Sequence, residues 1–132
     1  MEQKERDYFD RQVEWVLDRL PEKVLRILQE TPLHVEDQPA EDLWQELEIT
    51  DAEELCGCFS GTPYTESSVF TVGALLPNIV TIFRRGIIAA SRDEFGKVRR
   101  GQLRQQIRIT ILHELAHLHG MDEDEIIERG YG

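Results

Sequence analysis

Hydrophobic residues recur at helical spacing near both ends of the chain, with shorter patterns between them. From Asp7 to Leu20 the apolar positions fall on one side of a predicted helix; they are Phe9, Val13, Val16, Leu17 and Leu20. From about Lys97 the helical period returns over a longer stretch, with a core stripe of Leu103, Ile107, Ile111, Leu115 and Leu118. Ile109, Leu112 and Ala116 widen this stripe into a broad apolar face. We therefore predict that this helix is central to its domain, with Gly120 suited to end it.

The middle of the chain predicts shorter elements. Pro21 is suited to the first turn of a second helix, which would run through Val24, Leu25 and Leu28 until Pro32 ends it. Residues 33–35 alternate as in a short strand. A further helical stretch is expected from Pro39, containing Leu43, Trp44 and Leu47.

Glycine, proline and β-branched residues organise the next segment. Gly57 to Pro63 is predicted to be a loop, and Val69–Val72 is a possible strand. Asn78–Phe83 gives the strongest strand pattern because it is rich in β-branched and aromatic residues. We expect a short helix over Gly86–Ala90 and another after Asp122, where acidic residues favour a helix N-terminus.

Length and charge indicate one domain, residues 1–132, with an uneven charge distribution. Net charge is −11, and residues 1–55 carry all of this excess, with 6 basic against 17 acidic groups. No apolar run is long enough to span a membrane, and the polar first ten residues do not resemble a signal peptide. We expect a cytoplasmic protein with no membrane partner.

A basic stretch over residues 84–108 stands out against this acidity. It holds Arg84, Arg85, Arg92, Lys97, Arg99, Arg100, Arg104 and Arg108. These side chains could face the acidic N-terminal half or water, or they could form a surface for nucleic acid. We favour the first interpretation, because the field of the whole molecule would repel phosphate.

Candidate chemistry lies on the C-terminal helix, where the sequence reads His113-Glu-Leu-Ala-His117. Two histidines four residues apart project from the same helix face and can bind one ion. The neighbouring Glu114 is placed to take a proton from metal-bound water. This pattern is typical of a zinc hydrolase, although the short motif also occurs by chance in helices whose histidines are merely solvated.

A catalytic zinc ion usually has three protein ligands and a water. Gly120 allows the chain to turn just after His117, and Glu123 would then come back towards the metal. Asp122 and Asp124 are alternative third ligands. In the predicted mechanism, zinc-activated water attacks a peptide carbonyl and Glu114 acts as general base. Asn78–Phe83 could present a strand edge to an extended peptide substrate.

Other polar residues are assigned less specific roles. His119 points away from the pair on a helix and is interpreted as a packing or supporting residue, and His34 as a structural one. Arg84 and Arg85 could clamp a substrate carboxylate, although a solvated strand end is the commoner situation. Cys56 and Cys58 are too close in sequence for an unstrained disulfide and are expected to be free thiols. Tyr64, Tyr131 and an amide near Gly61 are candidate oxyanion donors.

Three blocks of this sequence resemble bacterial predicted zinc-dependent proteases that have a minimal matrix-metalloproteinase-like domain. The first block spans Gly57–Thr65, and the second spans Leu76–Arg85. The third is the metal motif, in which His113, Glu114, His117, Gly120 and Glu123 match. The resemblance covers about half of the chain. A leucine follows the second histidine here, where family members often have another histidine.

The resemblance implies a compact α+β fold of the zincin type, with a small sheet packed on a central active-site helix and with additional N-terminal helices. It also implies that His113, His117 and a downstream acid bind Zn²⁺, with Glu114 as the base and a peptide or protein as substrate. It supplies neither the substrate's identity nor the oligomeric state.

Two other functions remain open. A metal-dependent endoribonuclease could space three ligands similarly, with Glu123 at the third position, but Glu114 then stands where those enzymes have glycine. A metal-stabilised binding module without catalysis is the other alternative, although a purely structural site does not need a base and usually has four protein ligands.

Overall fold

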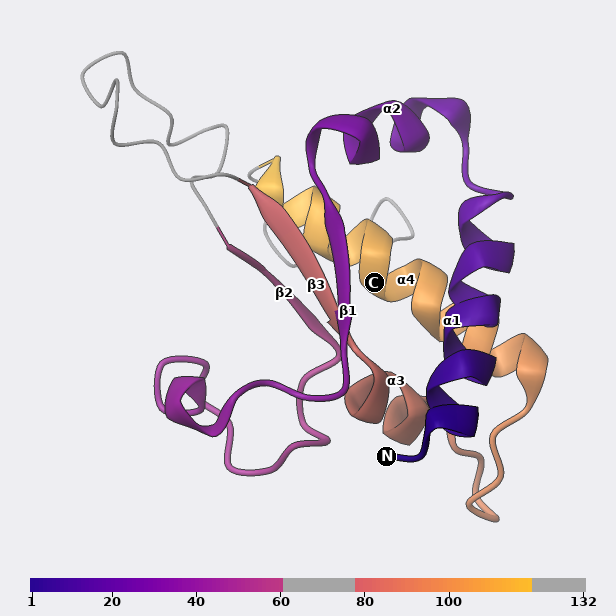
Figure 1. Cartoon of the computed structure of the whole chain (residues 1–132), viewed down its shortest axis with the longest axis vertical. Coiled ribbons are helices and arrows are strands. Elements are labelled where there is room, and N and C mark those ends of the chain that lie inside the picture. The colour runs from indigo at the N-terminus through magenta and orange to yellow at the C-terminus, as the bar shows by residue number, and fades with distance from the viewer. Residues whose placement is uncertain (61–77, 120–132) are drawn as a thin grey trace.

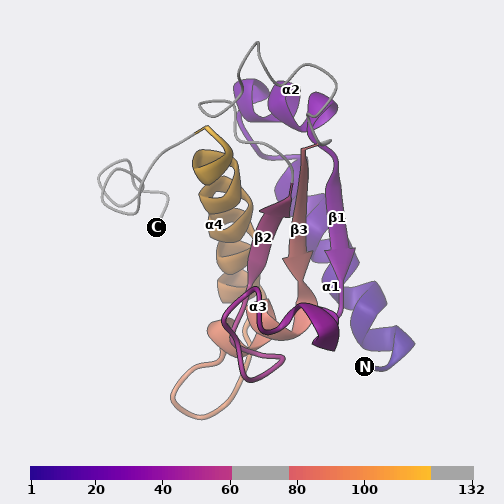
Figure 2. The same cartoon turned by 90° about the vertical axis from the view of Figure 1, so that its left-hand side faces the viewer.

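Three short strands form a mixed sheet in the computed structural model of this chain, which describes residues 1–60 and 78–119. Strand β3 (Ile79–Phe83) lies in the centre, parallel to β1 (Leu33–Glu36) and antiparallel to β2 (Gly57–Ser60). The described helices are α1 (Gln3–Leu17), α2 (Glu22–Glu30), α3 (Arg84–Ser91) and α4 (Arg100–Leu118). Figures 1 and 2 show α4 running along one face of the sheet, with α1 beside it. This arrangement confirms the predicted α+β fold with a sheet packed on a central helix.

Helix α4 forms the centre of the hydrophobic core. The five residues of its predicted apolar stripe are buried, none being more than 4% exposed. They pack in one cluster with the sheet residues Val80 and Ile82. The wide apolar face therefore reflects contacts with β2, β3, α1 and α3 on several sides of the helix.

The N-terminal helices agree closely with the pattern of apolar positions. Helix α1 buries Phe9, Val13 and Val16 against the core and ends at Leu17, and Leu20 is also buried beyond its end. Pro21 lies at the N-cap of α2, whose last residue is Glu30. The short helix predicted over Gly86–Ala90 is present as α3, although it begins at Arg84, two residues earlier than expected.

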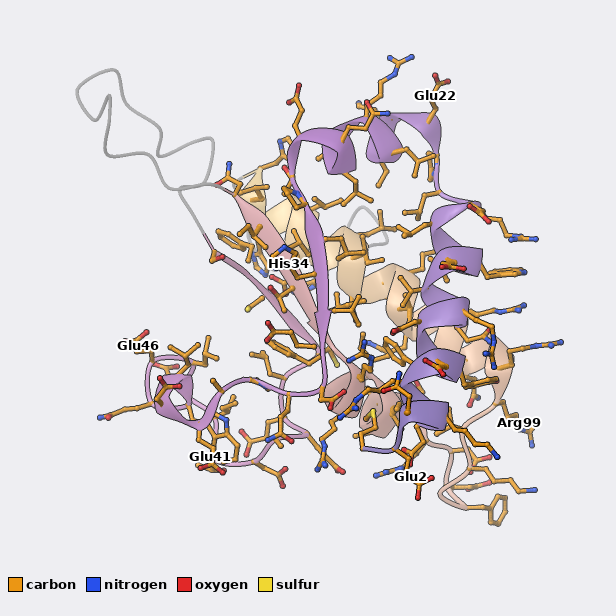
Figure 3. The ribbon with its side chains drawn as sticks, in the orientation of Figure 1. Glu2, Glu22, His34, Glu41, Glu46 and Arg99 are labelled. Carbon is orange, nitrogen blue, oxygen red and sulfur yellow. The ribbon has the colours of Figure 1, made fainter. Side chains whose placement is uncertain are left out.

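The predicted helix after Pro39 is wrong. Only a short 3₁₀ helix, η1 (Glu41–Leu43), forms there, followed by hydrogen-bonded turns that end at Glu48, which has a positive φ of 57°. Leu43 remains 44% exposed, so this segment has little core contact to stabilise a longer helix. Glu41 and Glu46 point away from the domain (Figure 3).

The predicted loop from Gly57 to Pro63 is also wrong over its first four residues, which form β2. Gly57 is buried and pairs with Ile82 in the sheet. A Cβ atom on Gly57 would lie 2.9 Å from Thr110 Cγ2 and 3.0 Å from the Thr81 carbonyl oxygen. Glycine is therefore required by the close approach of α4 to the sheet, and not by a turn. The possible strand Val69–Val72 and the helix after Asp122 lie outside the described residues.

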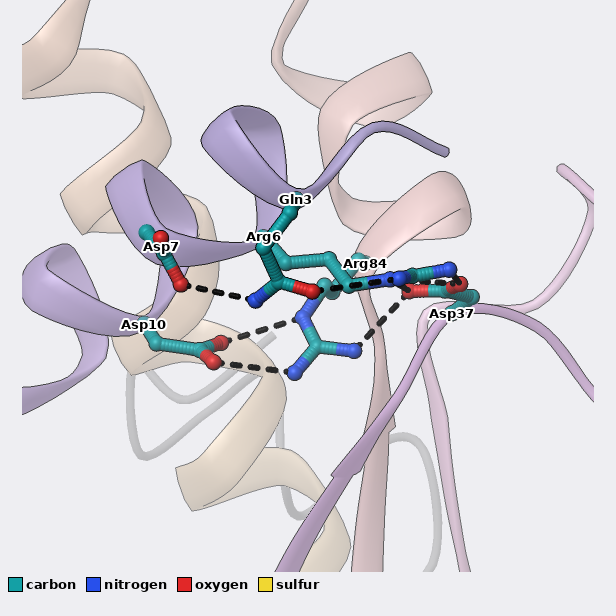
Figure 4. A network of polar contacts seen from close by, with 6 residues as sticks. All are labelled: Gln3, Arg6, Asp7, Asp10, Asp37 and Arg84. Atoms are coloured by element: carbon teal, nitrogen blue, oxygen red, sulfur yellow. Dashed lines mark hydrogen bonds and ion pairs between the residues drawn. The ribbon is translucent and has the colours of Figure 1, made fainter.

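A cluster of ion pairs joins α1 to the residues that directly follow β1 and β3 (Figure 4). Arg84 donates to both carboxylate oxygens of Asp10, at 3.0 Å each, and to Asp37 at 2.9 Å. Arg6 donates to the same Asp37 at 2.7 Å. Arg84 is therefore neither a substrate clamp nor a solvated strand end, because these carboxylates bind it and its side chain is only 12% exposed.

Part of the basic stretch does face the acidic half, as expected. Besides Arg84, Arg92 lies 3.5 Å from the Glu53 carboxylate. In the part of the chain that the structure describes, no helix has both the length and the hydropathy needed to cross a bilayer.

Candidate metal centre

His113 and His117 lie on consecutive turns of α4 and face one another. Their Nε2 atoms are 3.0 Å apart, and their ring centroids are 4.6 Å apart with an interplanar angle of 75°. Both rings are half-buried. The expected consequence of a four-residue spacing is therefore realised, because the two imidazoles bring the same type of nitrogen to one point.

This separation fits two ligands of a single ion. Zinc–nitrogen bonds measure about 2.0–2.1 Å, so two ligand nitrogens in ideal tetrahedral geometry lie about 3.4 Å apart. At 3.0 Å the same bonds would enclose an angle of about 95°. The pair needs only a small adjustment to hold zinc.

Glu114 lies beside the pair, at the contact between α4 and β2. Its Cγ would be 3.3 Å from a Cβ atom on Gly57, so the absent side chain at position 57 leaves room for the carboxylate. Thr110, one turn earlier, donates its hydroxyl to the Gln106 carbonyl at 2.8 Å and packs against the same glycine. The strand thus limits where the Glu114 side chain can go.

A cavity of about 220 Å³ opens next to His113 and Glu114. One wall comes from the chain entering β2 and the other from α4; the lining residues are Leu55, Cys56, Gly57, Gln106, Ile109, Thr110, His113 and Glu114. The cavity is large enough for an amino-acid side chain next to the histidine pair.

The two cysteines are free and half-buried, as expected. Burial raises the pKa of Cys58 to about 11, and the negative charges of Glu114 and Glu36 contribute. Burial also raises the pKa of Cys56, against the effect of a hydrogen bond with Thr110. Both thiols are therefore protonated at neutral pH.

The third predicted ligand, Glu123, lies outside the described residues, as do its alternatives Asp122 and Asp124. Gly120 and the candidate oxyanion donors also lie outside them. Within residues 1–60 and 78–119, no three potential ligand side chains come together around one point. The described residues thus supply two members of the predicted ligand set.

The remaining histidines do not join the pair. His119 is the exposed C-cap of α4, and its backbone N–H bonds to carbonyls of the last turn. His34 lies exposed on β1 (Figure 3). Phe59 of β2 is the aromatic neighbour of His117, at 6.5 Å between ring centroids with an interplanar angle of 29°.

The family comparison agrees with this geometry. A family model described as zincin-like metallopeptidase matches residues 28–131. The chain belongs to the zincin-like metallopeptidase family. The comparison with curated proteins gives no match. Helix α1 and most of α2 precede the matched residues, yet α1 belongs to the same hydrophobic core.

Membership of the zincin-like metallopeptidase family implies zinc binding. Sequence reasoning missed two residues that position it, Gly57 and Thr110. The sequence pattern predicts a loop at Gly57, whereas the structure places this residue in β2. Its position in the Gly57–Thr65 block, which resembles a family motif, is a signal of another role.

Proposed function

We propose that this protein is a zinc-dependent peptidase in which His113 and His117 provide two zinc ligands and Glu114 is the general base. The observation that carries the proposal is the 3.0 Å separation of the two Nε2 atoms beside Glu114. An acidic residue after α4 would complete the ligand set, with Glu123 as the preferred candidate and Asp122 and Asp124 as alternatives. A bound zinc ion supplies Lewis acidity, which polarises a peptide carbonyl and acidifies water.

Glu114 would carry out the proton transfers of the reaction. A carboxylate next to the first histidine can accept a proton from the attacking water and deliver it to the leaving amine. Glu114 lines the cavity together with Gly57 and His113, so in this scheme the base stands next to the space that a peptide would enter. A general base has to be held close to the reacting groups.

The substrate edge expected on β3 is wrong, because β1 and β2 pair with both sides of that strand. Among the described strands, β2 is the edge strand that packs against α4. The Phe83 N–H donates to the Cys56 carbonyl at 2.8 Å. Because antiparallel pairs alternate, the backbone groups of Gly57 and Phe59 then point away from β3. We assign the docking of an extended peptide to this outer edge of β2.

The main experiment compares three variants of the full chain by zinc content and by cleavage of a peptide library. Glu114→Gln should keep its zinc and lose at least about a hundredfold in hydrolysis, because only the base is removed. His113→Ala should lose both zinc and hydrolysis. His34→Ala removes an exposed histidine on β1 and should keep both.

Full hydrolysis by Glu114→Gln would disprove the catalytic scheme. A wild-type chain that binds zinc, cleaves no peptide and cuts RNA would instead favour the endoribonuclease alternative. Zinc binding without any hydrolysis, together with a fourth protein ligand, would favour a binding module.

A further inference from the structure

A second concave site lies on the other side of α4 from the histidines. It is a groove of about 390 Å³ between α1 and α4, a volume in the range of small-ligand sites. Its lining includes Trp15, Arg19, Gly101, Arg104 and Arg108. His113 and His117 follow Arg104 and Arg108 by nine residues each. Nine residues make about two and a half turns, so the two pairs face roughly opposite directions.

Two of the arginines are held by Trp15. The guanidinium carbons of Arg19 and Arg104 both lie 3.8 Å from the ring centroid. Two planar cations this close to one centroid would collide on the same face, so they must occupy opposite faces of the ring. Stacking on tryptophan also stabilises cations and orients their planes. The tryptophan thus keeps two guanidinium groups in fixed positions at the groove.

Among the described residues, these arginines use only part of their donor capacity. Arg104 donates through Nε to Gln12 at 2.8 Å, and Arg19 donates one N–H to the Trp15 carbonyl at 3.0 Å. A guanidinium has five N–H donors. Among residues 1–60 and 78–119, no carboxylate lies within ion-pair distance of Arg19, Arg100, Arg104 or Arg108.

The local field is therefore positive in a strongly acidic chain. Burial lowers the pKa of Arg104, and the charges of Arg100 and Arg19 lower it further. Arg100, Arg104 and Arg108 are spaced four residues apart, which places them along one side of α4. This arrangement contrasts with Arg84 and Arg92, whose charges are balanced by acids of the N-terminal half.

We propose that this arginine groove binds a compact multivalent anion, such as a small molecule with several phosphate or carboxylate groups. Fixed guanidinium groups suit both chemistries because they donate two parallel hydrogen bonds to either. A long polyanion fits less well, since the net charge of −11 would repel the part outside the groove. Nucleic acid would also lack a stacking platform at Trp15, whose two faces are occupied. The proposal does not depend on the peptidase function.

The test is calorimetric titration of the 132-residue chain, purified with zinc in the buffer, with two probes, fructose 1,6-bisphosphate and propane-1,2,3-tricarboxylate. They represent the phosphate and carboxylate sources, and neither chelates zinc strongly. We expect saturable binding of at least one probe, accompanied by a change in tryptophan fluorescence. The probe that binds more tightly shows whether the groove prefers phosphate or carboxylate groups.

Three variants and two controls locate the site. Arg108→Gln should weaken binding at least tenfold, because it removes a groove guanidinium that makes no ion pair with the described residues. Gly101→Glu should abolish binding by placing a carboxylate in the groove, where a Cβ atom has open space. Gly101→Ala and Arg26→Gln should bind as the wild type does, and all of these variants should keep their zinc. As a third variant, Arg104→Gln should weaken binding and also alter tryptophan fluorescence without ligand.

The proposal is overturned if neither probe gives saturable binding in the millimolar range. It is also overturned if Arg108→Gln binds as tightly as the wild type, since the anion would then sit elsewhere. Tighter binding of poly-glutamate or single-stranded RNA than of either probe would show an extended partner and refute a compact ligand.

Discussion

Two polar clusters lie near opposite ends of β3, and they differ in the charges that they bring together. The Arg84 cluster balances two cations with the carboxylates of Asp10 and Asp37 at 2.7–3.0 Å. The histidine pair instead brings two Nε2 atoms to 3.0 Å, a hydrogen-bond distance in this structure and, in our proposal, close to the separation of two ligands of one cation. In the first cluster the cations and carboxylates pair with one another, and these ion pairs hold α1 on the sheet. The second provides two of the zinc ligands in the function that we propose.

Breaking the Arg84 cluster should have the largest effect on stability. Arg84→Gln leaves two carboxylates near each other without their shared cation, and we expect a loss of about 3 kcal/mol in the free energy of unfolding, measured in urea. Arg26→Gln removes an exposed helix pair and should cost less than about 0.5 kcal/mol. Equal losses in the two variants would contradict a structural role for the Arg84 cluster.

Removing the metal should destabilise the protein through the other cluster. A ligand present at a hundred times its Kd adds about 2.7 kcal/mol to the folded state. Chelation should therefore lower the melting temperature of the wild type, measured by calorimetry with and without chelator. His113→Ala should show no such shift, and a wild type that melts at the same temperature in both conditions would argue against a tightly held ion.

Adding one methyl group at Gly57 should lower both the stability of the fold and the rate of hydrolysis. Gly57→Ala places a Cβ against Thr110, the Thr81 carbonyl and Glu114, so we expect a loss of about 1–3 kcal/mol. Hydrolysis should fall further than the folded fraction does, because Glu114 has to move. Gly101→Ala, which meets open space, is the matched control. Hydrolysis that falls only in step with the folded fraction would show that Gly57 does not position the base.

The smallest expected effect is a change of the Arg84 cluster with pH. The hydrogen bond from Arg6 lowers the pKa of Asp37 against the effect of burial, and Arg84 lowers it further. A carboxylate with a lowered folded-state pKa stabilises the fold above its unfolded pKa of about 3.9, and this contribution is lost as pH falls through the folded value. The stability difference between wild type and Asp37→Asn should thus be full near neutral pH and shrink below about pH 4. Asp7→Asn should show a much smaller difference at every pH, and a difference that grows on acidification would contradict this sign.

Local patterns predicted the long elements well. The buried stripe of α4 and the burial of Phe9, Val13 and Val16 follow from apolar residues at helical spacing, because helix geometry relates positions that are near in sequence. The predictions failed where distant contacts decide. The segment after Pro39 has little core to pack on, so the predicted helix does not form. Gly57 suggests a loop in the sequence, but the structure needs a glycine there because Thr110 of α4 packs against the strand.

The sequence by itself determined which residues share a face of α4, and hence that His113 and His117 can meet, because four residues make about one helical turn. Only the tertiary structure decided that β3 is a central strand and that Arg84 pairs with Asp10 and Asp37. It also decided that, among the described strands and side chains, β2 is the edge beside Glu114 and Arg108 makes no ion pair. Strand order and ion pairing depend on contacts between residues far apart in the chain, and no local periodicity encodes those contacts.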